Sequence, residues 1–382
     1  MIVFLSDIMH PAFRKAGPVS MFLTAVLAAA VACEPVRVEE QDNRIPAVQS
    51  EVIGFYLLNE GTMGANNATL DYADLRNGEY VSGFFSKQNP DMPLSLGDVG
   101  NDILLAGDCL AIALHGSGIV EIADARTAEH LAEIPVPGCR YLAEDGGSLY
   151  VTSYAEGGSL WKISLEDFSI VSKIGTGHDP EQLHIHDGFI YVLNSGGMQL
   201  DSGTGQTAYE HTVTVVDMSD FSVVRTDDVG FRNLYKVLCG GDYEYMTSRG
   251  DYMNESGAVF TYDRTSGEAV MIASVAVSNW CEYDGTVYTQ ATVYDENWNQ
   301  TVSLGRLCGK DYVEDDFADL SSAGIKACYG LDVNPATGDF VLTDAGDYVT
   351  PGAVHYFSAD GSLLWSHRAG VCPSRIVWIY ED

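Results

Sequence analysis

Nine arginine, tyrosine and tryptophan side chains in this 382-residue chain have the chemistry of a ligand-binding surface. They occur in short polar stretches that recur along the chain, and they are Arg140, Tyr141, Tyr154, Arg232, Arg249, Tyr252, Trp280, Tyr329 and Tyr348. Amphipathic rings can stack on a flat ligand, and guanidinium groups can donate hydrogen bonds to its polar periphery. These residue types therefore indicate binding of a large, polar, flat molecule.

Patterns typical of catalysis do not accompany these side chains. The sequence has no His-Asp-Ser order with a nucleophile-elbow glycine pattern, no phosphate-cradling Gly-Lys-Ser and no His-x-x-x-His zinc pair. His178, His184 and His186 lie close together, but the last two fall within a predicted strand, which favours a structural role. We expect no catalytic residue, no metal site and no cofactor. An enzyme that holds a metal through these histidines and nearby acids is the main alternative.

The elements that must position the nine side chains repeat along the sequence. Six turn glycines each precede a similar β-branched or aromatic run, and they are Gly107, Gly147, Gly188, Gly241, Gly285 and Gly338. They recur at intervals of roughly 40 to 55 residues, a period typical of propeller blades. A seventh copy, Ile53–Asn59, has Ile53 at the position of the turn glycine. We attribute this exception to its place at the start of the first strand, where no hairpin precedes it.

Each repeat continues with two further predicted strands. Leu160–Ser164 and Val171–Gly175 form one such pair, and Val259–Asp263 and Val270–Val275 form another. We therefore predict an all-β fold, a seven-bladed β-propeller of four-stranded antiparallel blades. Pro373–Tyr380 is predicted to supply the innermost strand of the first blade. Strands from both ends of the chain would then share one blade, close the ring and remove its exposed edges.

Antiparallel topology places two sets of loops on the same face of such a propeller. One set connects each blade to the next, and the other joins the second and third strands of a blade. Both sets carry the candidate residues: Arg140, Tyr141, Arg232, Trp280 and Tyr329 in the first, and Tyr154, Arg249, Tyr252 and Tyr348 in the second. One polar loop with an aromatic residue would indicate little, because loops are generally polar. Several such loops on one face indicate a binding surface.

The first fifty residues have a different composition from the rest. An apolar run, Met21–Cys33, follows a basic pair and is too short for a typical membrane-spanning helix. A basic pair followed by a short apolar run indicates a signal peptide. Small residues before Cys33 resemble a bacterial lipobox, in which the cysteine is acylated; ordinary signal cleavage is the alternative. We expect a lipoprotein signal in residues 1–33 ending at lipidated Cys33, a flexible acidic tether in 34–50, and the propeller in 51–382.

Charge and cysteine content exclude some classes of protein. The formal net charge is −34, with 20 basic against 54 acidic residues, and such a surface repels the phosphate backbone of nucleic acids. Acidic clusters such as Glu314–Asp316 lack the ligand spacing of a known calcium loop.

An odd number of cysteines follows Cys33, so a fully paired disulfide framework is excluded. Four of them lie just before or at the start of predicted innermost strands, namely Cys139, Cys281, Cys328 and Cys372. We expect these four to be small buried residues around the central channel; a metal ring is the alternative.

Several of these stretches resemble a known family. They are Asn59–Tyr72, Leu96–Ile103, Cys139–Tyr141, Pro180–Gln182, Asn194–Gly197, Ser248–Tyr252 and Asp344–Gly352. They resemble the YncE-like, seven-bladed surface lipoproteins of Bacteroidetes, and among these the chain is most similar to the BtuG lipoproteins, which capture cobalamin and cap the outer-membrane vitamin B12 transporter. The resemblance covers roughly residues 52 to 380, almost the whole predicted propeller.

The resemblance implies a non-enzymatic lipoprotein, anchored in the outer membrane and exposed at the cell surface. It would bind a corrinoid and deliver it to a TonB-dependent outer-membrane transporter. The aromatic side chains would pack on the corrin and its nucleotide base, while Arg140, Arg232 and Arg249 would contact amide carbonyls or the phosphate. A propeller lactonase, lyase or hydrolase and a glycan- or protein-binding scaffold are the alternatives.

Overall fold

The computed structural model describes residues 52–92, 95–197, 200, 207–240, 243–294 and 300–381. The predicted signal, Cys33 and the predicted tether lie outside these residues. Within the described part of the chain, no helix is both long enough and apolar enough to cross a membrane.

Strands account for nearly all of the regular structure, and they form seven four-stranded antiparallel sheets. From the inner to the outer strand, blade 1 is β28 (Pro373–Tyr380), β1 (Val52–Asn59), β2 (Thr69–Asp74) and β3 (Glu79–Val81). Blade 2 is β4 (Gly100–Ala106), β5 (Cys109–Leu114), β6 (Ile119–Asp124) and β7 (His130–Pro135). Blade 3 is β8 (Cys139–Asp145), β9 (Ser148–Ser153), β10 (Ser159–Ser164) and β11 (Ile170–Gly175).

The remaining blades have the same order. Blade 4 is β12 (Pro180–His186), β13 (Phe189–Asn194), β14 (Thr212–Asp217) and β15 (Ser222–Asp228). Blade 5 is β16 (Leu234–Gly240), β17 (Tyr243–Ser248), β18 (Ala258–Tyr262) and β19 (Ala269–Ala273). Blade 6 is β20 (Val277–Tyr283), β21 (Thr286–Tyr294), β22 (Gln300–Cys308) and β23 (Asp311–Glu314). Blade 7 is β24 (Cys328–Val333), β25 (Phe340–Asp344), β26 (Ala353–Phe357) and β27 (Leu363–Arg368). The helical pieces are short: α1 (Phe84–Gln88), α2 (Leu320–Ala323) and the 3₁₀ turn η2 (Ala155–Gly157).

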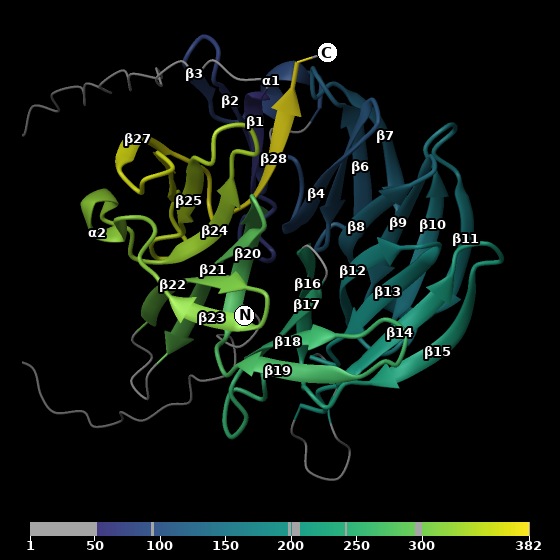
Figure 1. The fold of residues 1–382 in the computed structure, drawn as a ribbon. Coiled ribbons are helices and arrows are strands. Elements are labelled where there is room, and N and C mark those ends of the chain that lie inside the picture. The colour runs from purple at the N-terminus through teal and green to yellow at the C-terminus, as the bar shows by residue number, and fades with distance from the viewer. Residues whose placement is uncertain are drawn as a thin grey trace, which may run out of the picture. The chain divides into compact units, whose positions relative to one another are not determined.

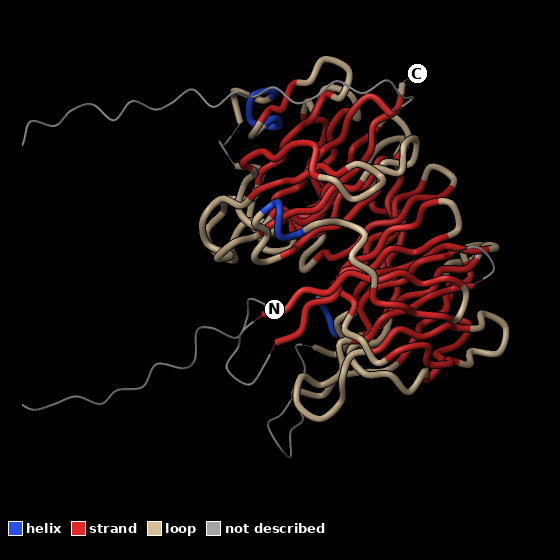
Figure 2. Tube along the Cα trace, turned by 60° about the vertical axis from the view of Figure 1, so that its left-hand side comes forward, coloured by secondary structure: helices blue, strands red, loops and turns tan. Residues whose placement is uncertain are grey.

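The seven blades are arranged in a ring around their inner strands. Each inner strand contacts the inner strand of the next blade, in the order β28, β4, β8, β12, β16, β20, β24 and back to β28. Figure 1 shows the blades fanning outward from this centre, and Figure 2 shows how completely strands dominate them. The predicted seven-bladed β-propeller is confirmed.

Ring closure depends on strands from opposite ends of the described chain. β1 pairs with β28 in antiparallel register, with Phe55 opposite Trp378 and Leu57 opposite Ile376. The rings of Phe55 and Trp378 also meet edge to face at 5.3 Å. The purple β1 and the yellow β28 lie side by side in Figure 1. The shared blade predicted from Ile53–Asn59 and Pro373–Tyr380 is confirmed.

The turn glycines have the backbone conformation that their position requires. φ is 62° at Gly107, 76° at Gly147 and 74° at Gly285, within the left-handed region that favours glycine. Gly241 lies outside the described residues. The first copy needs no such residue, because the inner strand that pairs with β1 is β28, from the other end of the described chain.

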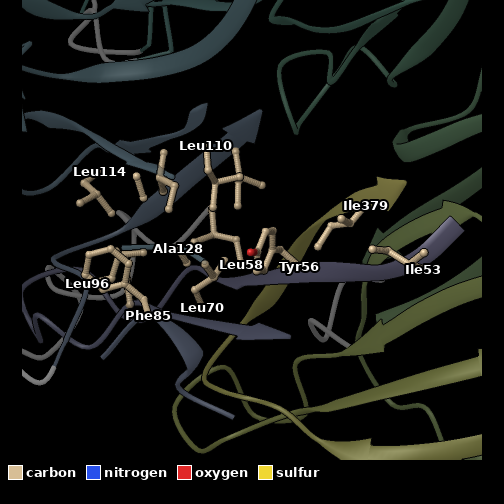
Figure 3. Close-up of a cluster of buried hydrophobic side chains, with 14 residues drawn as sticks. Ile53, Tyr56, Leu58, Leu70, Phe85, Leu96, Leu110, Leu114, Ala128 and Ile379 are labelled. Atoms are coloured by element: carbon tan, nitrogen blue, oxygen red, sulfur yellow. The ribbon is translucent and has the colours of Figure 1, made fainter. Parts of the chain in front are cut away.

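Apolar side chains from neighbouring blades pack against one another. Between blades 1 and 2, Leu58 and Leu70 meet Leu110 and Leu114, and Phe85 of the α1 helix covers the same cluster (Figure 3). Fully burying one such side chain contributes about 1.5–3 kcal/mol. Because each blade supplies one side of two such clusters, the blades stabilise one another around the ring.

The cysteines contribute to these interfaces. The seven cysteines after Cys33 are all free thiols. Cys139 and Cys328 begin their inner strands and Cys372 precedes one, as predicted, but Cys281 lies near the middle of β20. Cys139, Cys281 and Cys328 belong to the apolar clusters between blades, so they pack there instead of lining a central channel. Burial raises the pKa of Cys139 to about 12, which keeps that thiol protonated.

Removing the closing strand should destabilise the ring. We expect the chain lacking Val371–Asp382 to aggregate or to melt more than about 10 °C below the parent, because β1 loses its pairing partner and its neighbours lose the buried faces of Ile376 and Trp378. A chain lacking only Glu381 and Asp382 is the control. Thermal melts monitored by circular dichroism make the comparison. An unchanged melting temperature in the longer truncation would mean that β28 does not close the ring.

Candidate ligand-binding face

Two sets of loops meet on one face of the propeller, which we call the upper face. In six blades, the backbone N–H of the residue after the second strand donates to the carbonyl of the residue before the inner strand. Examples are Tyr154 to Gly138 and Arg249 to Asn233, each at 2.9 Å. The same bond joins His115 to Val99, Ser195 to Asp179, Ala345 to Ala327 and Glu60 to Cys372. The prediction that both loop sets share one face is confirmed.

The residue that accepts this bond has a left-handed backbone in five blades. φ is 62° at Gly138, 60° at Asn233 and 48° at Asp179, and these residue types tolerate the left-handed region. φ is also 54° at Val99 and 52° at Cys372, whose side chains tolerate it less well. A β-branched residue there is a genuine outlier, and strain of this kind concentrates at functional sites. The sharp turn brings the next residues to the centre of the ring.

Every inner strand then contains a β-bulge within its first residues. The register between inner and second strands shifts at this place in all seven blades, for example between Cys139 and Leu142 and between Leu234 and Val237. A bulge re-aims the side chains of the extra residue and its neighbour. The pairs presented in this way are Asn101 and Asp102, Arg140 and Tyr141, Glu181 and Gln182, Tyr235 and Lys236, Ser278 and Asn279, Tyr329 and Gly330, and Ser374 and Arg375.

Glu181 is the buried anion around which part of this ring is organised. Its side chain is 3% exposed, and its two oxygens accept hydrogen bonds from Arg140 at 2.8 Å and from the hydroxyl of Tyr154 at 2.5 Å. Arg249 Nη1 lies 4.0 Å from Oε1 of Glu181. Burial opposes ionisation of Glu181, but the nearby Arg140 and Arg249 hold its pKa below the usual range. A charged carboxylate of blade 4 therefore holds two side chains of blade 3 and lies beside one of blade 5.

Two tyrosine rings lie beside Glu181 and are surrounded by cations. The rings of Tyr141 and Tyr235 meet edge to face at 6.4 Å. The guanidinium carbon of Arg249 lies 3.3 Å from the ring centroid of Tyr235, and that of Arg375 lies 5.3 Å from the ring centroid of Tyr141. Arg375 also donates to the Tyr141 hydroxyl at 3.1 Å. Such stacking is a favourable cation–π arrangement.

Lys236 completes this group, which we call the axial cluster and define as Arg140, Tyr141, Glu181, Tyr235, Lys236, Arg249 and Arg375. Lys236 is 3% exposed, and its Nζ donates to Oδ1 of Asn279 at 2.5 Å. Burial, together with repulsion from Arg375 and Arg249, lowers the pKa of Lys236 well below its ordinary value.

Side chains of the bulges also connect neighbouring blades. Asn101 donates to the carbonyl of Arg140 at 2.6 Å, and Asp102 accepts from the backbone N–H of Leu142 at 3.0 Å. Gln182 and Asn279 make the corresponding contacts two and four blades further on, to Val237 N–H and Tyr329 carbonyl. These bonds hold the upper end of the ring in one geometry.

In blade 7, the rings of Tyr329 and Tyr348 meet edge to face at 5.7 Å. The Tyr329 hydroxyl donates to Glu60 at 2.5 Å, and the Tyr348 hydroxyl donates to Gln300 at 3.0 Å. Both rings are partly exposed, so they present aromatic surface on the upper face.

The structure brings together most of the residues selected from the sequence. Arg140, Tyr141, Tyr154, Arg249, Tyr329 and Tyr348 all lie around the ring axis, although Tyr141 is only 1% exposed. Tyr252 is 53% exposed and meets Tyr209 edge to face at 6.1 Å. Arg232 lies in a half-exposed ion pair with Glu255 at 3.4 Å.

Trp280 has a different environment from the other candidates. It is 9% exposed and packs with Tyr245, Val259 and Val287 between blades 5 and 6. The bulge in β20 directs Ser278 and Asn279 to the upper face and turns the next residue into the core.

Sequence reasoning did not select Asp102, Glu181, Tyr235, Lys236 and Arg375. A signal for them was present, because each is the second or third residue of an inner strand. Aligning the repeats on the first residue of each inner strand, and comparing the residues at each aligned position, would have selected all five.

The three histidines singled out from the sequence lie in two environments. His184 and His186 are in β12 as predicted, and His184 Nδ1 lies 2.9 Å from the buried Glu244, which also pairs with Arg264 at 2.7 Å. His178 is on the upper face, with Nδ1 2.5 Å from Glu210. Among the residues that the structure describes, no group of three or more His, Cys, Asp or Glu side chains is placed to hold a metal ion.

Comparison with known proteins supports the fold. No protein-family model and no curated protein matches the chain. Its structure is similar to a hydrazine synthase chain of Kuenenia stuttgartiensis, with a TM-score of 0.59 and 17% identity over 74% of this chain and 95% of that one. It is also similar to a quinoprotein alcohol dehydrogenase-like protein of Bacteroides thetaiotaomicron, with a TM-score of 0.52 and 14% identity over 86% and 79%. A streptogramin B lyase gives 0.50 and 11% over 71% and 83%. At these identities the likeness shows the propeller fold alone, and the YncE-like resemblance stays a prediction.

Asp332 should make stability fall as pH rises through the mildly acidic range. Burial raises its pKa to about 6, although Oδ1 accepts from Val333 N–H at 2.7 Å and from Trp378 Nε1 at 3.2 Å. Because the folded pKa exceeds the unfolded value of about 4, the stability contribution of the protonated acid is fully present below pH 4 and is lost as pH rises through 6.

We expect Asp332→Asn to remove this fall, which is of the order of 2–3 kcal/mol between pH 4 and pH 7, because the amide keeps the acceptor without the charge. Urea unfolding of both proteins across this range measures it, and the exposed Asp220→Asn is the control. Parallel curves for the parent and Asp332→Asn would contradict the assignment.

Proposed function

We propose that this protein is a surface-exposed lipoprotein that binds a corrinoid on its upper face and passes it to a TonB-dependent outer-membrane transporter. The observation that carries the proposal is the ring of seven bulges, which places at least one polar or aromatic residue near the upper end of every inner strand. A small-molecule site needs convergent polar groups among apolar surface, and this ring provides both. No residue is assigned a catalytic role.

The chemistry of the upper face suits a corrinoid. Such a ligand has a flat macrocycle, amide groups around its edge and a phosphodiester. Tyr252 and Tyr348 offer partly exposed rings for stacking, and Arg249 offers guanidinium donors. Glu181, Asp102 and Gln182 already hold neighbouring groups in place through hydrogen bonds. Little conformational freedom remains to be lost on binding, which favours high affinity.

The location of the protein rests on its sequence. A lipid on Cys33 would place the propeller at the membrane surface, and the acidic stretch 34–50 would separate the two. Delivery to a transporter needs this proximity, since the propeller itself would only store its ligand.

A propeller lyase or hydrolase is the second candidate. It is favoured by His178 and Glu210, whose 2.5 Å contact on the upper face is the arrangement of a carboxylate-held general base. Turnover that is lost in His178→Ala would support this function. Retention of cobalt-type visible absorbance after the protein is mixed with cobalamin and desalted would support the first.

Loss of Arg249 should weaken cobalamin binding. We expect Arg249→Ala to cost at least ~2 kcal/mol, or roughly thirtyfold in Kd, because truncation removes a stacked guanidinium at the ring axis. Arg264→Ala is a matched control: the two side chains are 27% and 26% exposed and both neighbour a buried glutamate, but Arg264 lies in the turn between a third and a fourth strand, on the opposite face. Calorimetry decides the matter. Equal binding by the two variants would remove Arg249 from the site, and no binding by the parent would remove the function.

Loss of Cys33 should release the protein from membranes. We expect Cys33→Ser to appear in the soluble fraction and to lose labelling by a palmitate analogue, since acylation needs this thiol. Cys239→Ser, which changes an exposed thiol of the propeller, is the control and should stay with the membrane. Persistent labelling of Cys33→Ser would contradict the lipoprotein assignment.

A further inference from the structure

The axial cluster contains cations that the proposed site has not yet fully used. Of the arginines expected to contact a phosphate, Arg140 is bound to Glu181 at 2.8 Å, and Arg232 pairs with Glu255 at 3.4 Å near the edge of the face. Arg249 is different. Its nearest carboxylate oxygen, on Glu181, is 4.0 Å away, which is beyond hydrogen-bonding distance.

The donors of Arg249 are therefore held in place without being used. Its guanidinium lies 3.3 Å from the Tyr235 ring centroid, and among the described residues its side-chain N–H groups donate no hydrogen bond. The side chain is 27% exposed, so a small molecule can reach it. Guanidinium N–H groups in a rigid plane match two oxygens of a tetrahedral oxyanion.

Two further cations face the same two tyrosine rings. Lys236 Nζ lies 5.2 Å from the Tyr235 centroid and donates one of its three hydrogens to Asn279. Arg375 lies over Tyr141 at 5.3 Å and is 20% exposed. Its contact with Asp102 is 3.6 Å. Arg140 Nε is also buried without a hydrogen-bond partner among the described residues.

The electrostatics of this cluster favour an anion. Arg249 and Arg375 both repel the ammonium of Lys236, which is one reason why its pKa is lowered. Glu181, Asp102 and Asp332 are the carboxylates near these cations, but none of them makes a hydrogen bond to Arg249 or Lys236. A bound oxyanion would relieve the repulsion and accept the remaining donors. Such convergence of positive charge is unusual in a chain with a net charge of −34.

We propose that Lys236, Arg249 and Arg375 form an oxyanion subsite at the ring axis, which takes a phosphate or a phosphoester group. The inference rests on the proposed use of the upper face for small molecules, but not on the ligand being a corrinoid. The oxyanion has two possible sources, free phosphate or the phosphoester of a larger ligand.

Binding of inorganic phosphate to the full chain tests the subsite. We expect calorimetry and thermal melts to show saturable phosphate binding that sodium chloride at matched ionic strength does not reproduce. Arg249→Gln should weaken it roughly tenfold or more, because a charge-assisted hydrogen bond is lost. Lys236→Met tests the buried cation, and Arg249→Gln keeps the test valid if the lysine variant fails to fold. Arg264→Gln, on the opposite face, should bind phosphate as the parent does.

The outcomes separate the subsite from the proposed function. Phosphate binding that is lost in Arg249→Gln and competes with cobalamin supports the subsite and assigns it to a phosphoester. Phosphate binding that is lost in this variant without competition supports it as a free-phosphate site. Phosphate binding with no cobalamin binding retains the subsite and removes the corrinoid function. Absence of saturable phosphate binding, or equal binding by Arg249→Gln, overturns the subsite even if cobalamin binds.

Discussion

The pairing of β1 with β28 is the constraint on which the rest of the structure depends. A blade can bury both of its faces only against two neighbours, so an open row of seven blades would leave two apolar faces in water. Phe55 and Trp378, which face each other across this pairing, lie in the cluster between blades 7 and 1. The axial cluster depends on the same closure, because Arg375 comes from β28 whereas its partner Tyr141 comes from blade 3. Side chains separated by most of the sequence can therefore meet only in a closed ring.

Within the closed ring, backbone irregularity determines what lies at the axis. Regular alternation would send successive residues of an inner strand to the two opposite faces of its blade, each of which packs against a neighbouring blade. The bulge after Cys139 or Leu234 interrupts this alternation, so that two consecutive residues serve the upper face. The left-handed residues before the inner strands make the turn possible. The hydrogen bond that each accepts from the residue after the second strand holds Val99 and Cys372 in that strained conformation. The geometry of the upper face is thus a product of local departures from an otherwise regular sheet.

The fold was predictable because its sequence signals act locally. The site was only partly predictable because it depends on bulges that have no such local signal. Turn glycines and alternating strands act locally, so Gly147 or Gly285 could be recognised one repeat at a time. The direction of a side chain near the start of an inner strand depends on a one-residue bulge, which composition does not reveal. Trp280 illustrates the difficulty: it lies one residue beyond Asn279, yet it packs in the core while Asn279 binds Lys236. The equivalent residues Leu142, Leu183 and Val237 are all apolar and buried. Comparing this position across the repeats would have indicated that Trp280 is buried.

The charge distribution of this protein would restrict recognition of the proposed anionic ligand to short range. The chain carries a net charge of −34, so an anionic ligand approaches against the overall field. At physiological ionic strength this field is screened over about 8 Å, and beyond that distance neither the acidic surface nor the axial cations guide the ligand. Near the axis the balance changes, because Lys236 and Arg249 are partly desolvated and interact with an anion more strongly than exposed groups do. An acidic exterior thus disfavours nucleic acids and other polyanions, while a ligand that reaches the partly exposed Arg249 would meet the cations beside Tyr235 and Tyr141.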